Sequence, residues 1–381
     1  MKKLFIVIFI FFVICLFISN NYDEEIKKEK RGIFVSYIEL SKYVKDKDIN
    51  TGKDNINRMI SNIKNLGFNL VILQVRSFSD AIYPSNIFSW SSSVSDVGVD
   101  PGYDILKYFI DLCHKNNILL YAWINPYRIS NSNDIKSIDK SNPAYKWIGT
   151  RNIVVGDNIY YNPSSDKAIE LISSGVLEIV SNYDVDGILF DDYFYPSTNC
   201  DYEEYLLTDK SISYDEYKLS RVNKMIEEVY SICREFNVLF GISPDANIEN
   251  NYNKLSADIY TWFSSNKYID YIMPQVYYVF FNESKAFKKV IDEWESLVKN
   301  SDIELMIALA FYKVGEEDKW ARSGYEEWIN NSDIIMREII LSRNLKYYSG
   351  FSLFRYDYLF NDSMYTNNTL LEIENMKKVL K

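Results

Sequence analysis

The chain has 381 residues, with 42 lysine and arginine residues against 53 aspartate and glutamate residues, so its net charge at pH 7 is −11. This acidic balance argues against a nucleic-acid partner, because phosphate binding needs a basic face. Hydrophobic residues make up 47% of the chain and charged residues 25%, a composition that excludes long disorder and a multi-span membrane protein.

The N-terminus has the pattern of an export signal. Lys2 and Lys3 precede an unbroken apolar run, residues 4–18, which is slightly short for a spanning helix of about 20 residues. A clean cleavage site is missing, so residues 1–22 fit a removed signal peptide and an N-terminal membrane anchor equally well. The charged segment 23–30 is typical of a solvated tether. We therefore expect an exported protein, at the cell surface or outside the cell, that is either released or anchored to the cytoplasmic membrane through residues 4–18.

Histidine and cysteine are too sparse for several kinds of chemistry. His114 is the only histidine, and the cysteines are widely spaced, with no CxxC motif. These counts argue against a Ser-His-Asp triad and against a histidine-rich zinc site. Acid and base catalysis would then fall to carboxylates, with tyrosine or lysine in support. We expect no metal and no cofactor.

From residue 31 to the end, short apolar runs alternate with amphipathic stretches of helical length. The expected strands are 32–37, 69–75, 118–124, 187–190, 238–242, 271–273, 304–310 and 350–354. The expected helices between them include 54–66, 103–116, 166–183, 215–236, 284–299 and 325–343. Apolar strands separated by helices indicate a parallel sheet buried on both faces, and eight such units favour a closed barrel. The sequence thus predicts an α/β protein whose residues 31–381 form a single (β/α)8 TIM barrel.

Polar side chains follow nearly every expected strand. In chain order they are Glu39; Gln74, Arg76 and Asp80; Trp123, Asn125 and Arg128; Asp191, Asp192 and Tyr193; Ser243, Asp245 and Asn247; Gln275 and Tyr277; Tyr312 and Lys313; and Arg355 and Asp357. In a TIM barrel the active site is built at the carboxyl ends of the strands. We therefore expect these groups to converge on one rim.

Several of these segments carry a family resemblance. They are 75–85 (VRSFSDAIYPS), 122–128 (AWINPYR), 161–163 (YNP), 184–196 (DVDGILFDDYFYP), 241–244 (GISP), 273–277 (MPQVY) and 312–315 (YKVG). Over residues 31 to 360 the chain resembles the glycosyl hydrolase-like 10 family of exported bacterial TIM-barrel proteins. The resemblance implies glycoside hydrolysis, in particular cleavage of peptidoglycan glycan strands stripped of their stem peptides. It also implies that the functional polar positions are Arg76, Asp80, Asn125, Arg128, Asp191, Asp192, Gln275, Tyr277 and Lys313.

Cleavage of a glycosidic bond needs one protonated carboxyl group at the leaving oxygen and a second carboxylate across the ring. We expect Asp191 or Asp192 to be the acid, because crowding of two adjacent acids raises the pKa of one of them. The partner is then Asp80 or the other member of the pair, with Glu39 as the third candidate. The expected substrate-binding residues are Arg76, Trp123, Asn125, Arg128, Tyr193, Gln275, Tyr277 and Lys313.

Two other functions fit the same residues. A non-catalytic barrel that binds cell-wall glycan would keep the aromatic and hydrogen-bonding groups but would form no product. A glycosidase for other β-linked polysaccharides would differ only in its substrate. Product formation and a bell-shaped pH profile separate the first alternative from an enzyme, and substrate profiling separates the second. The sequence does not indicate an oligomeric state.

Overall fold

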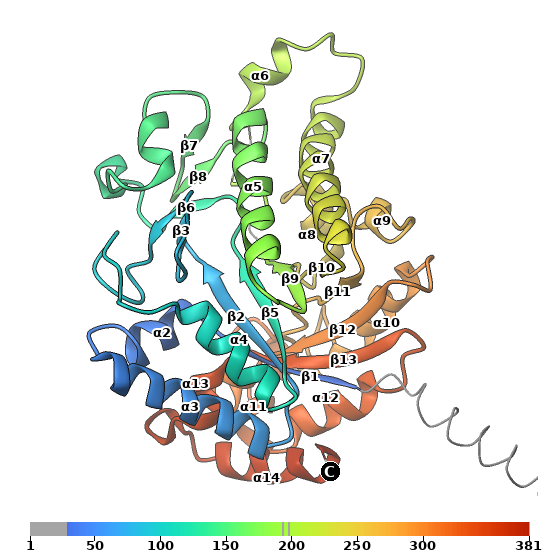
Figure 1. The fold of residues 1–381 in the computed structure, drawn as a ribbon. Coiled ribbons are helices and arrows are strands. Elements are labelled where there is room, and N and C mark those ends of the chain that lie inside the picture. The colour runs from blue at the N-terminus through green and yellow to red at the C-terminus, as the bar shows by residue number, and fades with distance from the viewer. Residues whose placement is uncertain (1–28, 193, 197–198, 381) are drawn as a thin grey trace, which may run out of the picture.

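The structure is a computed structural model that describes residues 29–192, 194–196 and 199–380 (Figure 1). Eight parallel strands close into a barrel in the order β1-β13-β12-β11-β10-β9-β5-β2, so each strand pairs with the next barrel strand along the chain. They are β1 (Lys30–Val35), β2 (Leu70–Arg76), β5 (Leu119–Ile124), β9 (Gly187–Phe190), β10 (Leu239–Ile242), β11 (Tyr271–Ile272), β12 (Glu304–Leu309) and β13 (Tyr348–Leu353). The predicted TIM barrel is confirmed.

The start of the barrel lies slightly earlier than the expected residue 31. β1 begins at Lys30, and the carboxylate of Glu29 accepts hydrogen bonds from Arg343 Nε at 2.7 Å and from Arg31 Nε at 2.8 Å. The last two residues of the expected tether, 23–30, are therefore part of the folded unit. The expected leader, residues 1–22, lies outside the described residues.

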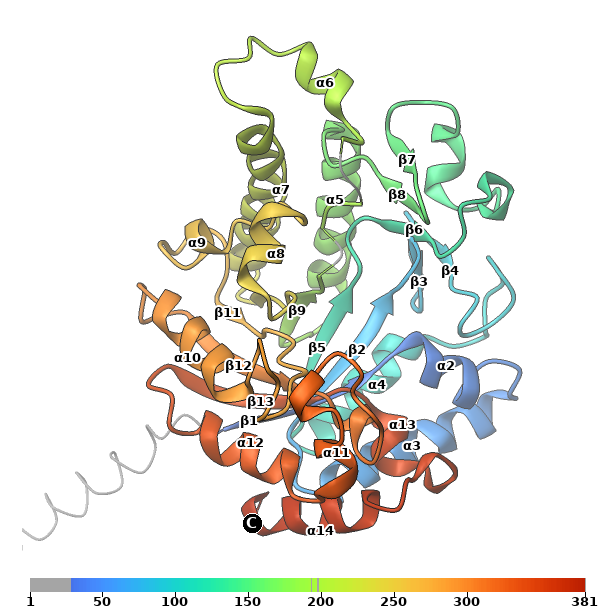
Figure 2. The same ribbon diagram turned by 180° about the vertical axis from the view of Figure 1, so that it is seen from behind.

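Helices surround the barrel (Figures 1 and 2). The longer ones are α3 (Ile49–Asn65), α4 (Ile105–Lys115), α5 (Asp166–Asn182), α7 (Tyr214–Glu235), α10 (Phe287–Leu297), α12 (Ile334–Ser342) and α14 (Thr369–Leu380). The shorter ones are α2 (Tyr37–Tyr43), α6 (Tyr202–Leu206), α8 (Ile248–Asn253), α9 (Ile259–Trp262), α11 (Glu327–Asn330) and α13 (Tyr356–Phe360). No helix among the described residues combines the length and the apolar character needed to cross a bilayer.

The expected helix 325–343 is in fact broken in two. α11 ends at Asn330, the next residue, Asn331, has an extended backbone, and α12 begins after Asp333. The side chain of Glu372 on α14 accepts hydrogen bonds from the backbone N–H groups of Ile334 at 3.0 Å and Ile335 at 2.9 Å. A carboxylate from a distant helix thus caps α12, which local periodicity cannot reveal.

Strand pleating decides which side chains enter the barrel. On β2, Leu70 and Ile72 belong to the interior cluster, whereas Val71 and Leu73 pack outward against the helices. Successive side chains on a strand point to opposite faces, so Gln74 is the next residue to face inward, at the carboxyl end. The same alternation carries β9 from the inward Leu189 to Asp191. Pleating therefore delivers polar side chains to the barrel mouth above an apolar interior.

Two tyrosines fill much of that interior, and two glycines make room for them. The rings of Tyr121 and Tyr271 lie 5.1 Å apart between centroids, and both side chains are fully buried. A Cβ atom at Gly187 would lie 2.8 Å from the ring of Tyr121, and one at Gly241 would overlap the ring of Tyr271. Any larger residue at either glycine would displace the tyrosines.

Additional segments rise beyond the carboxyl ends of the strands, with α6 and the adjoining ends of α5 and α7 (Figures 1 and 2). They contain a two-stranded sheet, β3 (Asp80–Ala81) and β4 (Ser89–Trp90), and a three-stranded sheet, β6 (Arg128–Ser130), β7 (Ile153–Val155) and β8 (Ile159–Tyr161). Short 3₁₀ turns complete the chain: η1 (Ile135–Ser137), η2 (Pro143–Trp147), η3 (Phe311–Lys313), η4 (Arg322–Gly324) and η5 (Asp362–Met364). The eightfold strand–helix alternation did not predict the small sheets.

Candidate active site

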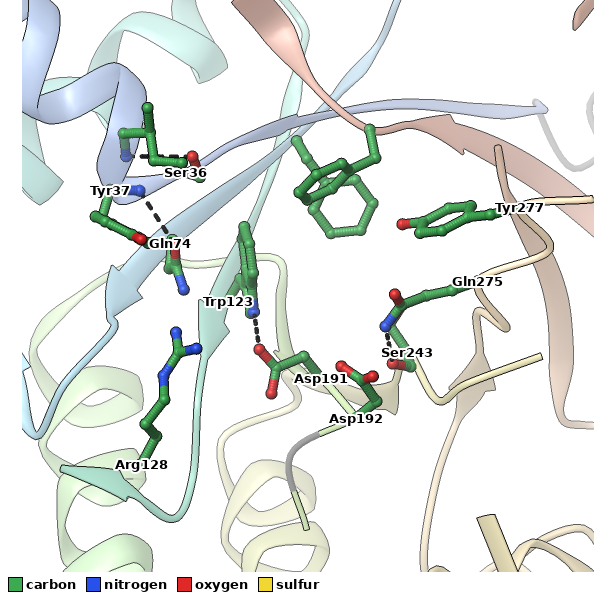
Figure 3. Close-up of a pocket in the computed structure, with 13 residues that line it drawn as sticks. Ser36, Tyr37, Gln74, Trp123, Arg128, Asp191, Asp192, Ser243, Gln275 and Tyr277 are labelled. Atoms are coloured by element: carbon green, nitrogen blue, oxygen red, sulfur yellow. Dashed lines mark hydrogen bonds between the residues drawn. The ribbon is translucent and has the colours of Figure 1, made fainter. Parts of the chain in front are cut away.

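A pocket of about 230 Å³ opens at the carboxyl end of the barrel, and we call it the central pocket (Figure 3). Its lining comes from the barrel strands and the segments that follow them: Phe34, Ser36, Tyr37, Ile38, Gln74, Trp123, Arg128, Asp191, Asp192, Ser243, Gln275, Tyr277 and Phe354. The predicted site residues brought together here are Trp123, Arg128, Asp191, Asp192, Gln275 and Tyr277. Tyr193 lies outside the described residues.

Asp191 is held by two hydrogen-bond donors on one oxygen. The indole Nε1 of Trp123 donates to Asp191 Oδ2 at 3.0 Å, and the amide Nδ2 of Asn125 donates to the same oxygen. The Asp191 side chain is almost fully buried. Two donors aimed at one carboxylate oxygen suit a charged carboxylate better than a carboxylic acid. Trp123 therefore orients an acid as well as forming part of the pocket wall (Figure 3).

A polar network fixes the amide of Asn125. Its Oδ1 accepts hydrogen bonds from Gln74 Nε2 at 2.6 Å and from Arg128 Nη2 at 3.0 Å. Gln74 is oriented in turn, because its Oε1 accepts the backbone N–H of Tyr37 at 3.0 Å. With the oxygen occupied by two donors, the amide nitrogen of Asn125 must face Asp191. Asn125 is thus in direct contact with Asp191, one member of the predicted catalytic pair.

Asp192 occupies a different environment from its neighbour. Burial raises the pKa of Asp192 above the ordinary value of 3.8, and the negative charge of Asp245 raises it further. A hydrogen bond from Gln275 and the positive charge of Arg128 oppose this increase. The two adjacent acids line one pocket because the constraint of strand pleating ends with β9 at Phe190.

Asp245 follows β10, and hydrogen bonds from two neighbouring residues hold its carboxylate in place. Its Oδ1 accepts the backbone N–H of Asn247 at 2.8 Å, and its Oδ2 accepts Asn250 Nδ2 at 2.7 Å. The sequence placed Asp245 after a strand but gave it no role. Asp245 lies near Asp192 because β10 pairs with β9 in the barrel. In the sequence, the position of Asp245 after an expected strand is the only signal that could have indicated this proximity.

The structure does not bring Asp80 into the central pocket, contrary to our expectation. Asp80 Oδ1 accepts the backbone N–H groups of Ser77 at 3.0 Å and Phe78 at 2.9 Å, and so closes the turn after β2. Asp80 lines a neighbouring hollow that also contains Trp90. Its carboxylate stabilises a loop and does not face the Asp191–Asp192 pair.

Arg76 is also placed elsewhere, because β2 is irregular near its end. The register between β2 and β5 shifts between Gln74 and Arg76, which reverses the expected alternation. The guanidinium of Arg76 lies 4.1 Å from the ring centroid of Phe88, and a Cβ atom at Gly175 on α5 would overlap it. Arg76 therefore packs between the barrel and α5 instead of facing the pocket.

Two further residues hold the loops behind the pocket. Lys313 Nζ donates to Tyr277 O and to Asp318 Oδ2, both at 2.8 Å, and it lines an outer hollow instead of the central pocket. Glu39 is fully buried, where it caps α2 through the backbone N–H of Ser36 and pairs with Arg355. Both side chains support the site from outside it.

Comparison with known proteins agrees with this geometry. A profile of the glycosyl hydrolase-like 10 family matches residues 29–325. Glycosyl hydrolase YngK of Bacillus subtilis (strain 168) is 32% identical over 323 residues, which is 77% of this chain and 61% of YngK. Glycosyl hydrolase DigH of Escherichia coli O6:H1 is 30% identical over 334 residues, which is 79% of this chain and 74% of DigH. The chain thus spans less than two thirds of the length of YngK.

Solved structures share the fold at low sequence identity. The PgaB (BpsB) glycoside hydrolase domain from Bordetella bronchiseptica superimposes with a TM-score of 0.60 at 13% identity, covering 91% of this chain and 99% of that domain. The catalytic domain of β-amylase from Paenibacillus polymyxa gives a TM-score of 0.55 at 11% identity, covering 93% and 99%. Since the family profile spans most of the sequence, the chain belongs to the glycosyl hydrolase-like 10 family.

Proposed function

We propose that this protein is an exported glycoside hydrolase that cleaves the glycan strands of the bacterial cell wall, in particular strands freed of their stem peptides. The observation that carries the activity is the pair Asp191 and Asp192, two adjacent acids in unlike environments in one pocket. When the surroundings of two acids give them different pKa values, one acid can donate a proton while the other acts as a charged carboxylate. Family membership supports the reaction class, and the family resemblance in the sequence supports the substrate.

In the proposed mechanism Asp192 is the general acid. Its raised pKa keeps a proton available for the leaving oxygen, and Arg128 and Gln275 hold the sugar hydroxyls around it. Asp191, charged and oriented by Trp123 and Asn125, stabilises the positive charge that develops on the sugar ring. Retention of the anomeric configuration in the product, followed by proton NMR, would make Asp191 the nucleophile, and inversion would make it the base.

The direct test uses Asp191→Asn and Asp192→Asn proteins with amidase-treated glycan strands. Each variant should lose about 10²- to 10⁴-fold in turnover, the usual contribution of a positioned acid or base. New reducing ends and chromatography of the fragments measure the product. Unchanged turnover in both variants would refute the assignment. Binding without any product would favour a non-catalytic glycan-binding barrel. Turnover confined to chitin or β-glucan would show that the substrate is another polysaccharide.

Location is tested by cell fractionation. Lys2, Lys3 and the apolar run 4–18 support export. The full chain should appear in the membrane, wall or medium fraction, and a chain lacking residues 1–22 should stay in the cytoplasm. A full chain that remains in the cytoplasm would refute both the export of the protein and its action on the cell wall.

A further inference from the structure

Trp320 is the most exposed large hydrophobic residue in the described part of the chain, at 90%. It belongs to the loop that follows β12 and η3, on the carboxyl side of the barrel strand. A tryptophan offers a large apolar face and one polar N–H group, a combination enriched where proteins contact ligands and partners. A sugar ring, with an apolar face and polar edges, matches such a surface.

The loop that carries Trp320 is anchored to the central pocket. The backbone N–H of Trp320 donates to Asp318 Oδ1 at 3.2 Å, and Asp318 is buried. Lys313 Nζ joins Asp318 Oδ2 to the backbone oxygen of Tyr277, with both distances 2.8 Å. Tyr277 itself lines the central pocket. A held loop loses little entropy when a ligand binds, which favours binding at this surface.

A chain of aromatic rings joins the hollow beside this loop to the central pocket. Trp320, Tyr312 and Tyr358 line a hollow that we call the outer pocket. The ring centroid of Tyr312 lies 6.0 Å from that of Tyr358, 5.7 Å from that of Tyr277 and 6.0 Å from that of Phe354. Tyr277 and Phe354 line the central pocket, so Tyr312 stands between the two hollows.

We propose that the outer pocket is a second sugar-binding site for the same glycan chain, where Trp320 stacks on a pyranose ring remote from the bond that is cut. This inference rests on the proposed function and goes beyond it, because it makes the enzyme select polymers over short sugars. The exposed carboxylates of Glu316 and Glu317 line the same pocket and accept hydrogen bonds from sugar hydroxyls. A disaccharide in the central pocket gains nothing from these groups, whereas a long strand gains all of them.

The kinetic test compares Trp320→Ala, Trp320→Phe and Tyr260→Ala on long strands and on an aryl glycoside of the repeating disaccharide. Tyr260 is an exposed aromatic residue on α9, outside both pockets, and serves as the matched control. Trp320→Ala should raise KM for long strands about tenfold, as expected for one stacked aromatic contact, and leave the aryl glycoside unaffected. Trp320→Phe should retain most of the affinity. Equal KM values for Trp320→Ala and the parent would overturn the inference.

A binding test separates this inference from the proposed function. In an Asp192→Asn background, long strands should change the tryptophan fluorescence through Trp320 and through Trp123 in the central pocket, and addition of Trp320→Ala should reduce that change and weaken binding about tenfold. Absence of turnover in the parent, together with Trp320-dependent binding, would refute hydrolysis and keep the outer site. Turnover with binding that does not depend on Trp320 would refute the outer site and keep hydrolysis. Absence of binding to any strand would refute the outer site.

Discussion

Asp191 and Asp192 differ in their neighbours although they are adjacent in sequence. Donors from Trp123 and Asn125 converge on one oxygen of Asp191, whereas Asp192 is desolvated and lies near the charge of Asp245. Sequence inspection identified the pair but could not distinguish the environments of its two members. That distinction arises from side chains supplied by β5 and by the loop after β10, which meet only in the folded barrel.

The alkaline limit of activity should depend on Asp245. Burial and the charge of Asp245 raise the pKa of Asp192, so the acid keeps its proton to higher pH and turnover falls as the pH rises through that pKa. In Asp245→Asn the repulsive charge is gone, the pKa of Asp192 falls, and the alkaline limb of kcat/KM against pH should move to lower pH. The exposed and remote Asp209→Asn should leave the limb in place. A limb that stays, or moves to higher pH, would contradict the role of Asp192.

Asp80→Asn should distinguish a loop-supporting residue from a catalytic one. The substituted amide keeps an oxygen that can accept the N–H groups of Ser77 and Phe78, so the turn should persist. Turnover of glycan strands should stay within about threefold of the parent, far less than the loss expected for a positioned acid or base. A hundredfold loss of turnover in a variant with an unchanged melting temperature would show that Asp80 takes part in catalysis.

At the scale of elements, burial on both faces made the eight barrel strands predictable. Each is a short apolar run, and the expected and observed ranges differ by a few residues at most. Local irregularities escaped prediction for physical reasons. The register shift on β2 depends on its pairing with β5, and it turns Arg76 outward. The start of α12 depends on Glu372, a residue on another helix.

Buried acids between α11, α12 and α14 should make stability depend on pH. Glu338 is fully buried, and burial, with added repulsion from Glu372 and Glu327, raises its pKa well above 4.5. The charges of Lys313 and Arg337 oppose this shift. Burial likewise raises the pKa of Glu372 to about 7. Between pH 4.5 and its folded-state pKa, each such group keeps its proton in the folded state but loses it in the unfolded state, so stability falls over that interval by about 1.4 kcal/mol per pH unit for each group.

Removing the ionisable group should flatten this dependence. The melting temperature of the parent should fall between pH 5 and pH 8, and that of Glu338→Gln should fall less. Glu374→Gln, an exposed substitution on the same helix as Glu372, should follow the parent. Differential scanning calorimetry at the two pH values measures the effect. Parallel curves for the parent and Glu338→Gln would show that Glu338 is already charged in the folded protein.

At the scale of the whole molecule, the net charge limits how the protein would bind a glycan. The chain carries a net charge of −11, and Arg128 is the one basic side chain among the described residues that line the central pocket. With the proposed cell-wall substrate, long-range attraction to an anionic envelope would be weak, and recognition would depend on hydrogen bonds and aromatic contacts at short range.

The packed tyrosines of the barrel interior determine where a substrate can enter and where products can leave. Tyr121 and Tyr271 plug the tube below the acids, with Gly187 and Gly241 leaving them the space to do so. The tube is consequently a dead end. For the proposed glycan substrate this means that the polymer cannot thread through the barrel, and both fragments of a cut strand would have to leave at the carboxyl end, where the intact strand entered.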